Sequence, residues 1–147
     1  MGIWFREYSL EELNTIAKGN LVSHVGIEFI EIGADYLKAR MPVDQRTKQP
    51  FGILHGGASV VLAETVGSYA ANMVVDYPKE IFVGQEINAN HIRPVSSGYV
   101  TGTASPLHMG KNSQVWEIKI YDEQEKLVCA SRITMALAKS NDQAGNG

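Results

Sequence analysis

One acidic side chain, Glu64, lies in a stretch of apolar and small residues. Residues 60–66 read VVLAETV, and no Lys or Arg lies within two helical turns on either side. Glutamate is rarely buried unless it is paired, and burial without a partner raises the pKa of its carboxyl. Glu64 is therefore a candidate for acid–base or nucleophilic chemistry in a cleft. The alternative is a carboxylate on the solvated edge of a helix.

A second candidate, His55-Gly56-Gly57, stands at the start of a long apolar stretch, residues 55–74. This stretch is long enough for a buried helix of about five turns. The first N–H groups of a helix lack internal partners and lie at the positive end of its dipole, so they suit a developing oxyanion. Glycines also allow a substrate to approach the backbone closely. Glycine pairs at helix starts are common, so the motif gains meaning only together with Glu64.

The spacing of these two candidates predicts an active site shared between subunits. Gly56 and Glu64 are eight residues apart, which is roughly 12 Å along a helix axis. A carboxylate that attacks a carbonyl group must come within about 3–3.5 Å of the carbonyl carbon, while the N–H groups at the helix start would hold the oxygen of that same carbonyl. One helix cannot supply both groups, but an antiparallel copy can bring Glu64 of one chain to Gly56 of another.

The residues before these motifs predict a short helix. Ser9 and Glu12 form a capping box, in which each side chain would bond the other residue's backbone N–H. One apolar face follows at Leu10, Leu13 and Ile16. We expect this helix to end near Gly19-Asn20.

The rest of the chain predicts strands. Residues 24–42 alternate with a period of two around Gly33-Ala34-Asp35, which indicates a β-hairpin starting at His24. Three or four further strands are expected at about 81–91, 98–108, 112–121 and 127–138, with connections short enough for antiparallel neighbours. The expected architecture is α+β, with one long helix facing a five- or six-stranded antiparallel sheet. A helix this apolar needs cover on more than one face, which favours oligomers.

Composition limits the class of protein. The chain has 147 residues, of which 44% are hydrophobic and 20% charged, so we expect one domain over residues 1–139 and a disordered tail over 140–147. A net charge of −3 disfavours nucleic acid as the main partner. The single cysteine, Cys129, excludes an internal disulfide and is expected to be a small buried residue. No apolar run long enough to span a membrane and no signal-peptide core are found, so we expect a cytoplasmic protein without membrane partners.

Residues 49–64, QPFGILHGGASVVLAE, resemble the signature of the hotdog-fold acyl-CoA thioesterases. The likeness extends over residues 3–138. It is strongest to two sister groups, the 1,4-dihydroxy-2-naphthoyl-CoA thioesterases of menaquinone synthesis and the proofreading thioesterases of enterobactin synthesis. Those groups share the segments 41–44 (MPVD), 87–91 (INANH) and 106–108 (PLH) with this chain. The resemblance implies a hotdog fold, an antiparallel sheet wrapped around one long central helix, with a short N-terminal helix.

The resemblance also implies roles for individual residues. Glu64 matches the catalytic carboxylate, acting as nucleophile or as general base on water, and Gly56 matches the backbone N–H that polarises the thioester carbonyl. Gln49 and His55 match side chains that help to hold the thioester, and Ser68 matches one that orients Glu64 or the water. The positions that match the lining of the acyl-CoA site are Gly84, His91, Ile92, Arg93, Pro94, His108, Met109, Gly110, Lys111, Asn112 and Ser113.

The implied activity is hydrolysis of an aromatic acyl-CoA, foremost 1,4-dihydroxy-2-naphthoyl-CoA, with no cofactor and no metal. The expected assembly is a dimer with shared active sites that pairs into a tetramer. Residues proposed to line the pocket for a flat ring are Tyr69, Ala70 and Met73. Without the resemblance, His91 and His108 could be ordinary strand histidines, and Arg93 and Lys111 solvated charges.

Other functions stay open on the sequence alone. One is proofreading of a misloaded aryl-carrier protein, and another is hydrolysis of a broad range of acyl-CoA esters. A hotdog dehydratase would eliminate water from a 3-hydroxyacyl thioester and release no free thiol. An acyl-CoA-binding module would bind the ester without turnover.

Overall fold

The long helix expected after His55 forms as α3, Gly56–Met73, in the computed structural model, which describes residues 2–139. His55 caps the helix, because its backbone is extended and its Nδ1 accepts a hydrogen bond from the Gly57 N–H at 2.8 Å. Small residues let α3 approach the sheet closely. A side chain at Gly67 would begin only 2.8 Å from Ile133 on the sheet.

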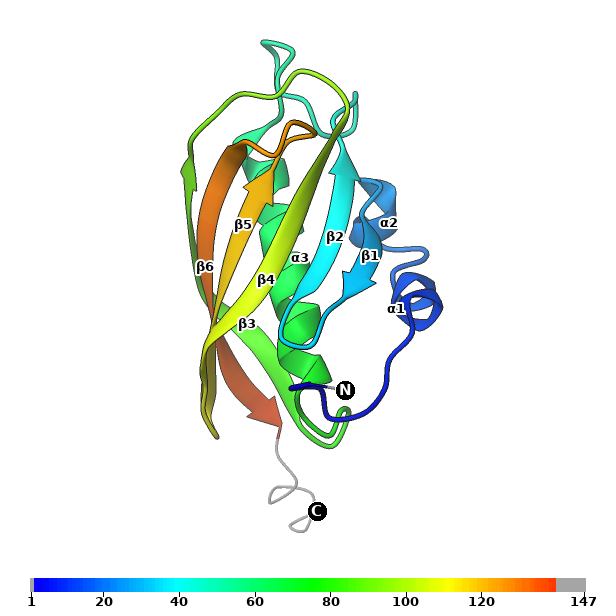
Figure 1. Cartoon of the computed structure of the whole chain (residues 1–147), viewed down its shortest axis with the longest axis vertical. Coiled ribbons are helices and arrows are strands. Elements are labelled where there is room, and N and C mark those ends of the chain that lie inside the picture. Colours follow the sequence, from blue (N-terminus) through cyan, green and yellow to red (C-terminus); the bar gives the residue numbers. More distant parts are fainter. Residues whose placement is uncertain (1, 140–147) are drawn as a thin grey trace.

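Six antiparallel strands curve around α3 in the spatial order β1-β2-β4-β5-β6-β3 (Figure 1). The strands are β1 Glu28–Ile32, β2 Leu37–Pro42, β3 Ile81–His91, β4 Tyr99–Met109, β5 Ser113–Tyr121 and β6 Leu127–Lys139. The last four lie within one residue of the predicted bounds. The α+β architecture expected from the sequence is thus confirmed, and β1 and β3 form the two edges of the sheet.

The N-terminal region differs from the prediction. The first helix, α1, is Leu10–Ile16, and a second short helix, α2, occupies Leu21–His24, where the hairpin was expected to begin. Asn20 starts α2, because its Oδ1 accepts a hydrogen bond from the Val22 N–H at 3.0 Å. Gly26, with a φ of +81°, then turns the chain, and the first strand starts only at Glu28.

The predicted capping box forms only in part. Ser9 Oγ accepts from the Glu12 N–H at 3.1 Å, as expected, but the Glu12 carboxylate forms an ion pair with Arg6 instead of returning to the Ser9 backbone. A guanidinium outcompetes a neutral N–H for a carboxylate, because both partners are charged and two parallel bonds form. Two hydrogen bonds, of 3.0 and 2.8 Å, also join the Asn14 amide to the backbone of Phe29, so α1 is fixed to β1.

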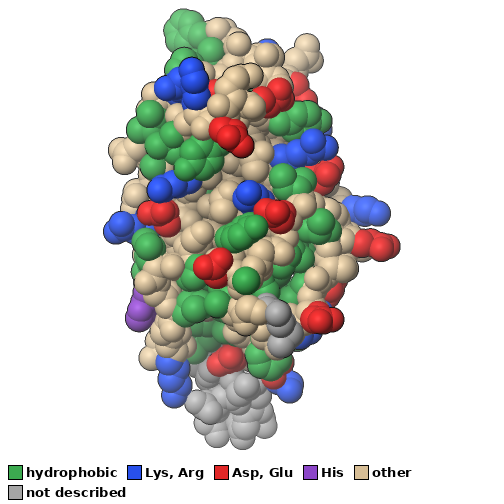
Figure 2. Space-filling view, in the orientation of Figure 1, with side chains coloured by type: hydrophobic (Ala, Val, Ile, Leu, Met, Phe, Trp, Pro, Cys, Tyr) green, Lys and Arg blue, Asp and Glu red, His purple; other side chains and the backbone are tan. Residues whose placement is uncertain are grey.

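The core lies between α3 and the concave face of the sheet and includes the fully buried Trp116. Trp4 stacks on Trp116, with the two ring centroids 6.4 Å apart. Cys129 is fully buried, as predicted, and burial raises the pKa of its thiol. On the face drawn in Figure 2, acidic and basic side chains are interspersed with apolar ones, without a large patch of one sign. The expected disordered tail, 140–147, lies outside the described residues.

Candidate active site

The start of α3 presents a backbone donor beside an imidazole. Within residues 2–139, the Gly56 N–H has no hydrogen-bond partner. The His91 ring, from the end of β3, lies against the glycine, since a side chain at Gly56 would begin 2.8 Å from His91 Nε2. A helix N-terminus with a free N–H is suited to stabilising an oxyanion.

A cavity of about 340 Å³ opens in front of this donor. It is lined by Gln49, Ile53, Leu54, Gly56, Ser59, His91, Ile92, Arg93, Pro94 and Val128. Six of these were candidates from the sequence or the resemblance, so the fold brings them together. His55 lies beside them as the helix cap, with an exposed side chain.

Gln49 is held by its own loop. Its side-chain carbonyl accepts a hydrogen bond from the Phe51 N–H, and its backbone N–H donates to Ile53 O at 2.9 Å. Gly52 closes the turn with a φ of +82°, a conformation that favours glycine. The NH₂ group of the Gln49 amide is then the donor that remains for a ligand.

Glu64 lies away from this cavity, against β3. Its side chain is exposed in the single chain, and its Oε2 lies 2.9 Å from the point where a side chain at Gly84 would begin. The absence of that side chain gives the carboxylate its room. The structure thus places Gly84 directly beside Glu64, as expected for two residues of one site.

Ser68 is one turn further along α3, but its hydroxyl does not bond Glu64. The Ser68 Oγ instead lies 3.8 Å from Met135 Sδ on β6. The same serine lines a second pocket, described below. A direct hydrogen bond that orients Glu64 is therefore not formed in the single chain.

The β4–β5 hairpin carries the remaining candidates, residues 108–113. Its turn is held by the Gly110 N–H to Ser113 O bond at 2.9 Å, and Asn112 O accepts from Leu137 N–H at 3.0 Å. Ser113 pairs with Ala136 and Gly84 with Met135, so this hairpin lies at the Glu64 end of β3. His91 pairs with Cys129, six residues before Met135 on β6, which is roughly 20 Å away along the strand.

The candidates therefore form two groups within one chain. Gln49, His55, Gly56 and His91–Pro94 gather at the start of α3. Glu64, Ser68, Gly84 and the hairpin 108–113 lie toward the other end. A single copy of the described chain therefore does not bring the two groups of candidates together.

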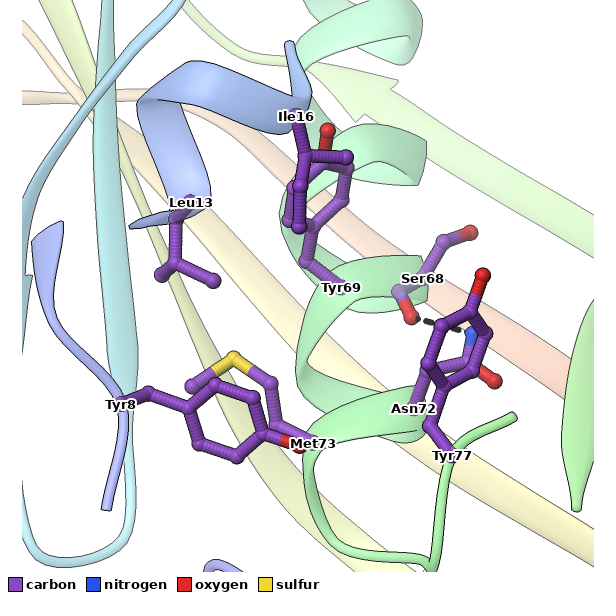
Figure 3. A pocket seen from close by; sticks show the side chains of 8 residues that line it. All are labelled: Tyr8, Leu13, Ile16, Ser68, Tyr69, Asn72, Met73 and Tyr77. Atoms are coloured by element: carbon purple, nitrogen blue, oxygen red, sulfur yellow. Dashed lines mark hydrogen bonds between the residues drawn. The ribbon is translucent and has the colours of Figure 1, made fainter. Parts of the chain in front are cut away.

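A second pocket, of about 210 Å³, lies one turn beyond Glu64 between α1 and α3 (Figure 3). Its lining residues are Tyr8, Leu13, Ile16, Ser68, Tyr69, Asn72, Met73 and Tyr77. Tyr69, Ala70 and Met73 were expected to line a pocket, and Tyr69 and Met73 line this one. The prediction for Ala70 is wrong, because Ala70 is fully buried in the core. The Tyr69 ring stacks on Phe29 at 4.4 Å.

Sequence patterns did not identify the other side of this pocket. Tyr8 and Tyr77 are far apart in the chain, and neither belongs to a motif. Ile16 was expected on a buried face but is 58% exposed, because it lies at the mouth of the pocket. Burial raises the pKa of the Tyr8 and Tyr69 phenols above the ordinary value, at which a tyrosine is already protonated at neutral pH.

Residues 2–139, the part of the chain that the structure describes, lack two features. No group of three or more His, Cys, Asp or Glu side chains is arranged to hold a metal ion in this part of the chain. In the same residues, no helix is both long and apolar enough to cross a membrane.

Known proteins resemble this chain over most of its length. A family model described as Thioesterase superfamily matches residues 51–129. The 1,4-dihydroxy-2-naphthoyl-CoA hydrolase of Escherichia coli K12 is 53% identical over 135 residues, covering 92% of this chain and 98% of that protein. The proofreading thioesterase EntH of Cronobacter turicensis is also 53% identical, with the same coverage of both chains.

A solved structure supports the same assignment. The crystal structure of a thioesterase from Haemophilus influenzae superposes with a TM-score of 0.91 at 49% identity, and the match covers 93% of this chain and 95% of that one. The six-stranded sheet around α3 is accordingly a hotdog fold. The chain belongs to the thioesterase superfamily, and it is a thioester hydrolase.

Proposed function

We propose that this protein hydrolyses an aromatic acyl-CoA, with 1,4-dihydroxy-2-naphthoyl-CoA as substrate, to the free acid and CoA. The observation that carries the proposal is the exposed Glu64 carboxylate, which lies beside Gly84 and one helical turn before Ser68, a residue that lines the tyrosine-rich pocket. A relative at 53% identity is named for hydrolysis of that ester. Tyrosines line the pocket with flat apolar faces and with hydroxyls, which suits an aromatic ring that carries hydroxyl groups.

The proposed chemistry divides between the two groups of residues. The Gly56 N–H would donate to the thioester oxygen and stabilise the negative charge that develops there. Gln49 and His55 would help to hold the thioester, and Ser68 lies on the Glu64 side of the acyl group. Arg93 and Lys111, from the two lining segments, are cations for the phosphates of CoA.

Glu64 can act in either of two ways. As a general base, its carboxylate takes a proton from water, and the oxygen of that water attacks the carbonyl carbon. The tetrahedral intermediate then expels CoA as a thiolate, which is protonated to the thiol. As a nucleophile, Glu64 attacks the carbon itself and displaces CoA as a thiolate, which is protonated to the thiol. Water then hydrolyses the mixed anhydride to the free acid and the Glu64 carboxylate.

A two-fold dimer would unite the two halves of the site. β3 is an edge strand, so one side of it is unpaired within a chain and can pair with another strand. An antiparallel pairing of two β3 strands, centred on Ile87 or on Asn88, would put Gly84 of one copy close to His91 of the other. Glu64 of each copy would then face Gly56 of its partner. The tetramer and the cytoplasmic location stay predictions.

A thiol-release assay with purified protein tests the activity. We expect a higher kcat/KM with benzoyl-CoA and 1,4-dihydroxy-2-naphthoyl-CoA than with palmitoyl-CoA. The reason is that a pocket of about 210 Å³ has no room for a long acyl chain. Preference for palmitoyl-CoA would contradict the aromatic assignment, and no thiol release from any ester would contradict hydrolysis.

A second candidate substrate is a misloaded aryl-carrier protein, since a proofreading thioesterase is equally similar at 53% identity. The same assay distinguishes the two candidates when an aryl-loaded carrier protein is added to the panel. A kcat/KM for the carrier protein above that for every CoA ester would favour proofreading.

A further inference from the structure

The pocket in Figure 3 has a closed end and an open mouth. Leu13 on α1 and Met73 on α3 are 2% and 3% exposed, whereas Ile16 and Tyr77 are 58% and 54% exposed. Leu13 and Met73 therefore form the closed end, and Ile16 and Tyr77 flank the mouth. Ser68 lines this pocket and lies one helical turn from Glu64, so the pocket begins close to the proposed catalytic carboxylate.

From this arrangement we infer that α1 sets the size of the acyl group, with Leu13 limiting its length and Ile16 limiting access at the mouth. The inference rests on the proposed function, because it assigns the acyl group to this pocket. The wall formed by α3 includes Ser68, which lies one turn from the proposed catalytic residue Glu64. The wall formed by α1 faces it and contains none of the proposed catalytic residues.

The α1 wall is held in place by contacts on several sides. The Asn14 amide makes two hydrogen bonds with the Phe29 backbone, and Arg6 pairs with Glu12 at the start of the helix. Just before α1, the Phe5 N–H donates to Met73 O at 2.9 Å, at the end of α3 itself. A ligand that is too large would have to break these contacts, so the wall acts as a fixed limit.

The opposite wall is equally fixed. Tyr69 stacks on Phe29, the residue that also receives Asn14, so one segment of β1 holds both walls. A cavity of about 150 Å³ lined by apolar side chains is enough to bind benzene. At about 210 Å³, this pocket has room for a flat group larger than benzene, such as two fused rings, and a longer acyl group would meet Leu13.

The position of α1 in the chain supports a separate role in specificity. The model of the thioesterase superfamily matches residues 51–129, which include Gly56 and Glu64 but not α1. Leu13 and Ile16 can therefore change without altering the residues proposed to perform hydrolysis.

Two substitutions with opposite expected effects test the inference. Leu13→Ala lengthens the pocket and should raise the kcat/KM ratio of 4-phenylbenzoyl-CoA to benzoyl-CoA by at least about tenfold, since one methylene in an apolar pocket already changes discrimination about 10- to 200-fold. Ile16→Trp adds bulk at an exposed position, so the variant is expected to fold. It should lower the kcat/KM ratio of 1,4-dihydroxy-2-naphthoyl-CoA to benzoyl-CoA by about tenfold. Leu10→Ala is the matched control, because Leu10 is on α1 but does not line the pocket.

The outcomes separate the inference from the proposed function. Shifted ratios in the two pocket variants, with an unchanged ratio in Leu10→Ala, support the inference. Unchanged ratios in the pocket variants, with benzoyl-CoA still hydrolysed, would overturn the role of α1 alone. If Leu13→Ala does not fold, Ile16→Trp decides. Failure of the unsubstituted protein to hydrolyse any of these esters would overturn the proposed function, and the inference with it.

Discussion

The position of the Glu64 carboxylate depends on a residue that has no side chain. Glu64 Oε2 occupies the space beside Gly84, where even a methyl group would begin 2.9 Å away. Gly56 likewise makes room for His91, since a side chain at Gly56 would begin 2.8 Å from His91 Nε2. In both halves of the proposed site, a glycine on one element makes room for a polar side chain from another.

The Glu64 carboxylate can be tested by removing its charge and little else. Glu64→Gln should lower kcat by about 10²–10⁴-fold with KM nearly unchanged, because the amide can neither attack the thioester nor take a proton from water. Steady-state kinetics with benzoyl-CoA measures this, and a melting temperature equal to that of the unsubstituted protein is the control. A variant that keeps more than about a tenth of the rate would show that Glu64 does not carry the reaction.

The backbone donor of Gly56 can be tested with two substitutions at that position. Gly56→Pro removes the N–H and should lower kcat by about 10²–10³-fold. His55, with φ −69° and ψ 131°, has the extended backbone that a following proline requires. Gly56→Ala is the matched control, since it keeps the N–H and only displaces the His91 ring. Equal loss of kcat in both variants would argue against the N–H as the donor.

Glu64 became a candidate from the sequence because a carboxylate is unusual within VVLAETV. In the single chain its side chain is exposed, so its catalytic role stays a prediction. Gly84 was expected only through the family resemblance, since nothing in a strand pattern connects it to a residue of the preceding helix. Tyr8 and Tyr77 could not be predicted as pocket residues. They line the same pocket only because the segment before α1 and the segment after α3 lie close together in the fold, which no local pattern encodes.

At the scale of elements, one amide joins α3 to β3. Asn72 Nδ2 donates to Ser68 O and to Phe82 O at 2.9 and 3.0 Å, and its Oδ1 accepts from the Phe82 N–H at 2.8 Å. Phe82 is the second residue of β3, so these bonds set where the strand starts relative to the helix. The same placement puts Gly84 beside Glu64.

Loss of this connection should destabilise the fold. Asn72→Ala leaves the N–H and C=O of Phe82 without their side-chain partner, and each unsatisfied buried group costs about 1–3 kcal/mol. Urea unfolding followed by fluorescence measures the free energy of unfolding. Asn112→Ala, an exposed position on the β4–β5 hairpin, is the control and should change stability by less than about 0.5 kcal/mol. Equal stability of the two variants would contradict a structural role for Asn72.

The bounds of α3 and of the last four strands could be predicted because each has a long, regular pattern that ends at polar or glycine residues. Residues 24–27 were assigned wrongly to a strand. Val25 and Ile27 are buried, as a strand would require, but they belong to a turn after α2. Alternating burial over so few residues does not distinguish a strand from a helix end. Here Asn20 caps a helix and Gly26 turns the chain after it, so no strand forms before Glu28.

At the scale of the whole molecule, the chain carries the two halves of the proposed site at separate places on the hotdog fold. The proposed oxyanion donor, the Gly56 N–H, lies at the start of α3, and Glu64 lies about 12 Å further along the helix. The unpaired edge of β3 runs past both groups. A two-fold pairing along that edge would form two complete sites, each with residues from both copies.

Complementation between two inactive variants tests this shared site most directly. Glu64→Ala and Gly56→Pro would each leave one half of every site defective. In a mixed dimer, one site receives both intact groups and the other receives both defects. Refolding the two variants together in equal amounts should restore up to about a quarter of the unsubstituted activity, since about half of the dimers are mixed and each has one intact site. No recovery, with folded mixed dimers confirmed by native mass spectrometry, would show that each active site lies within a single chain.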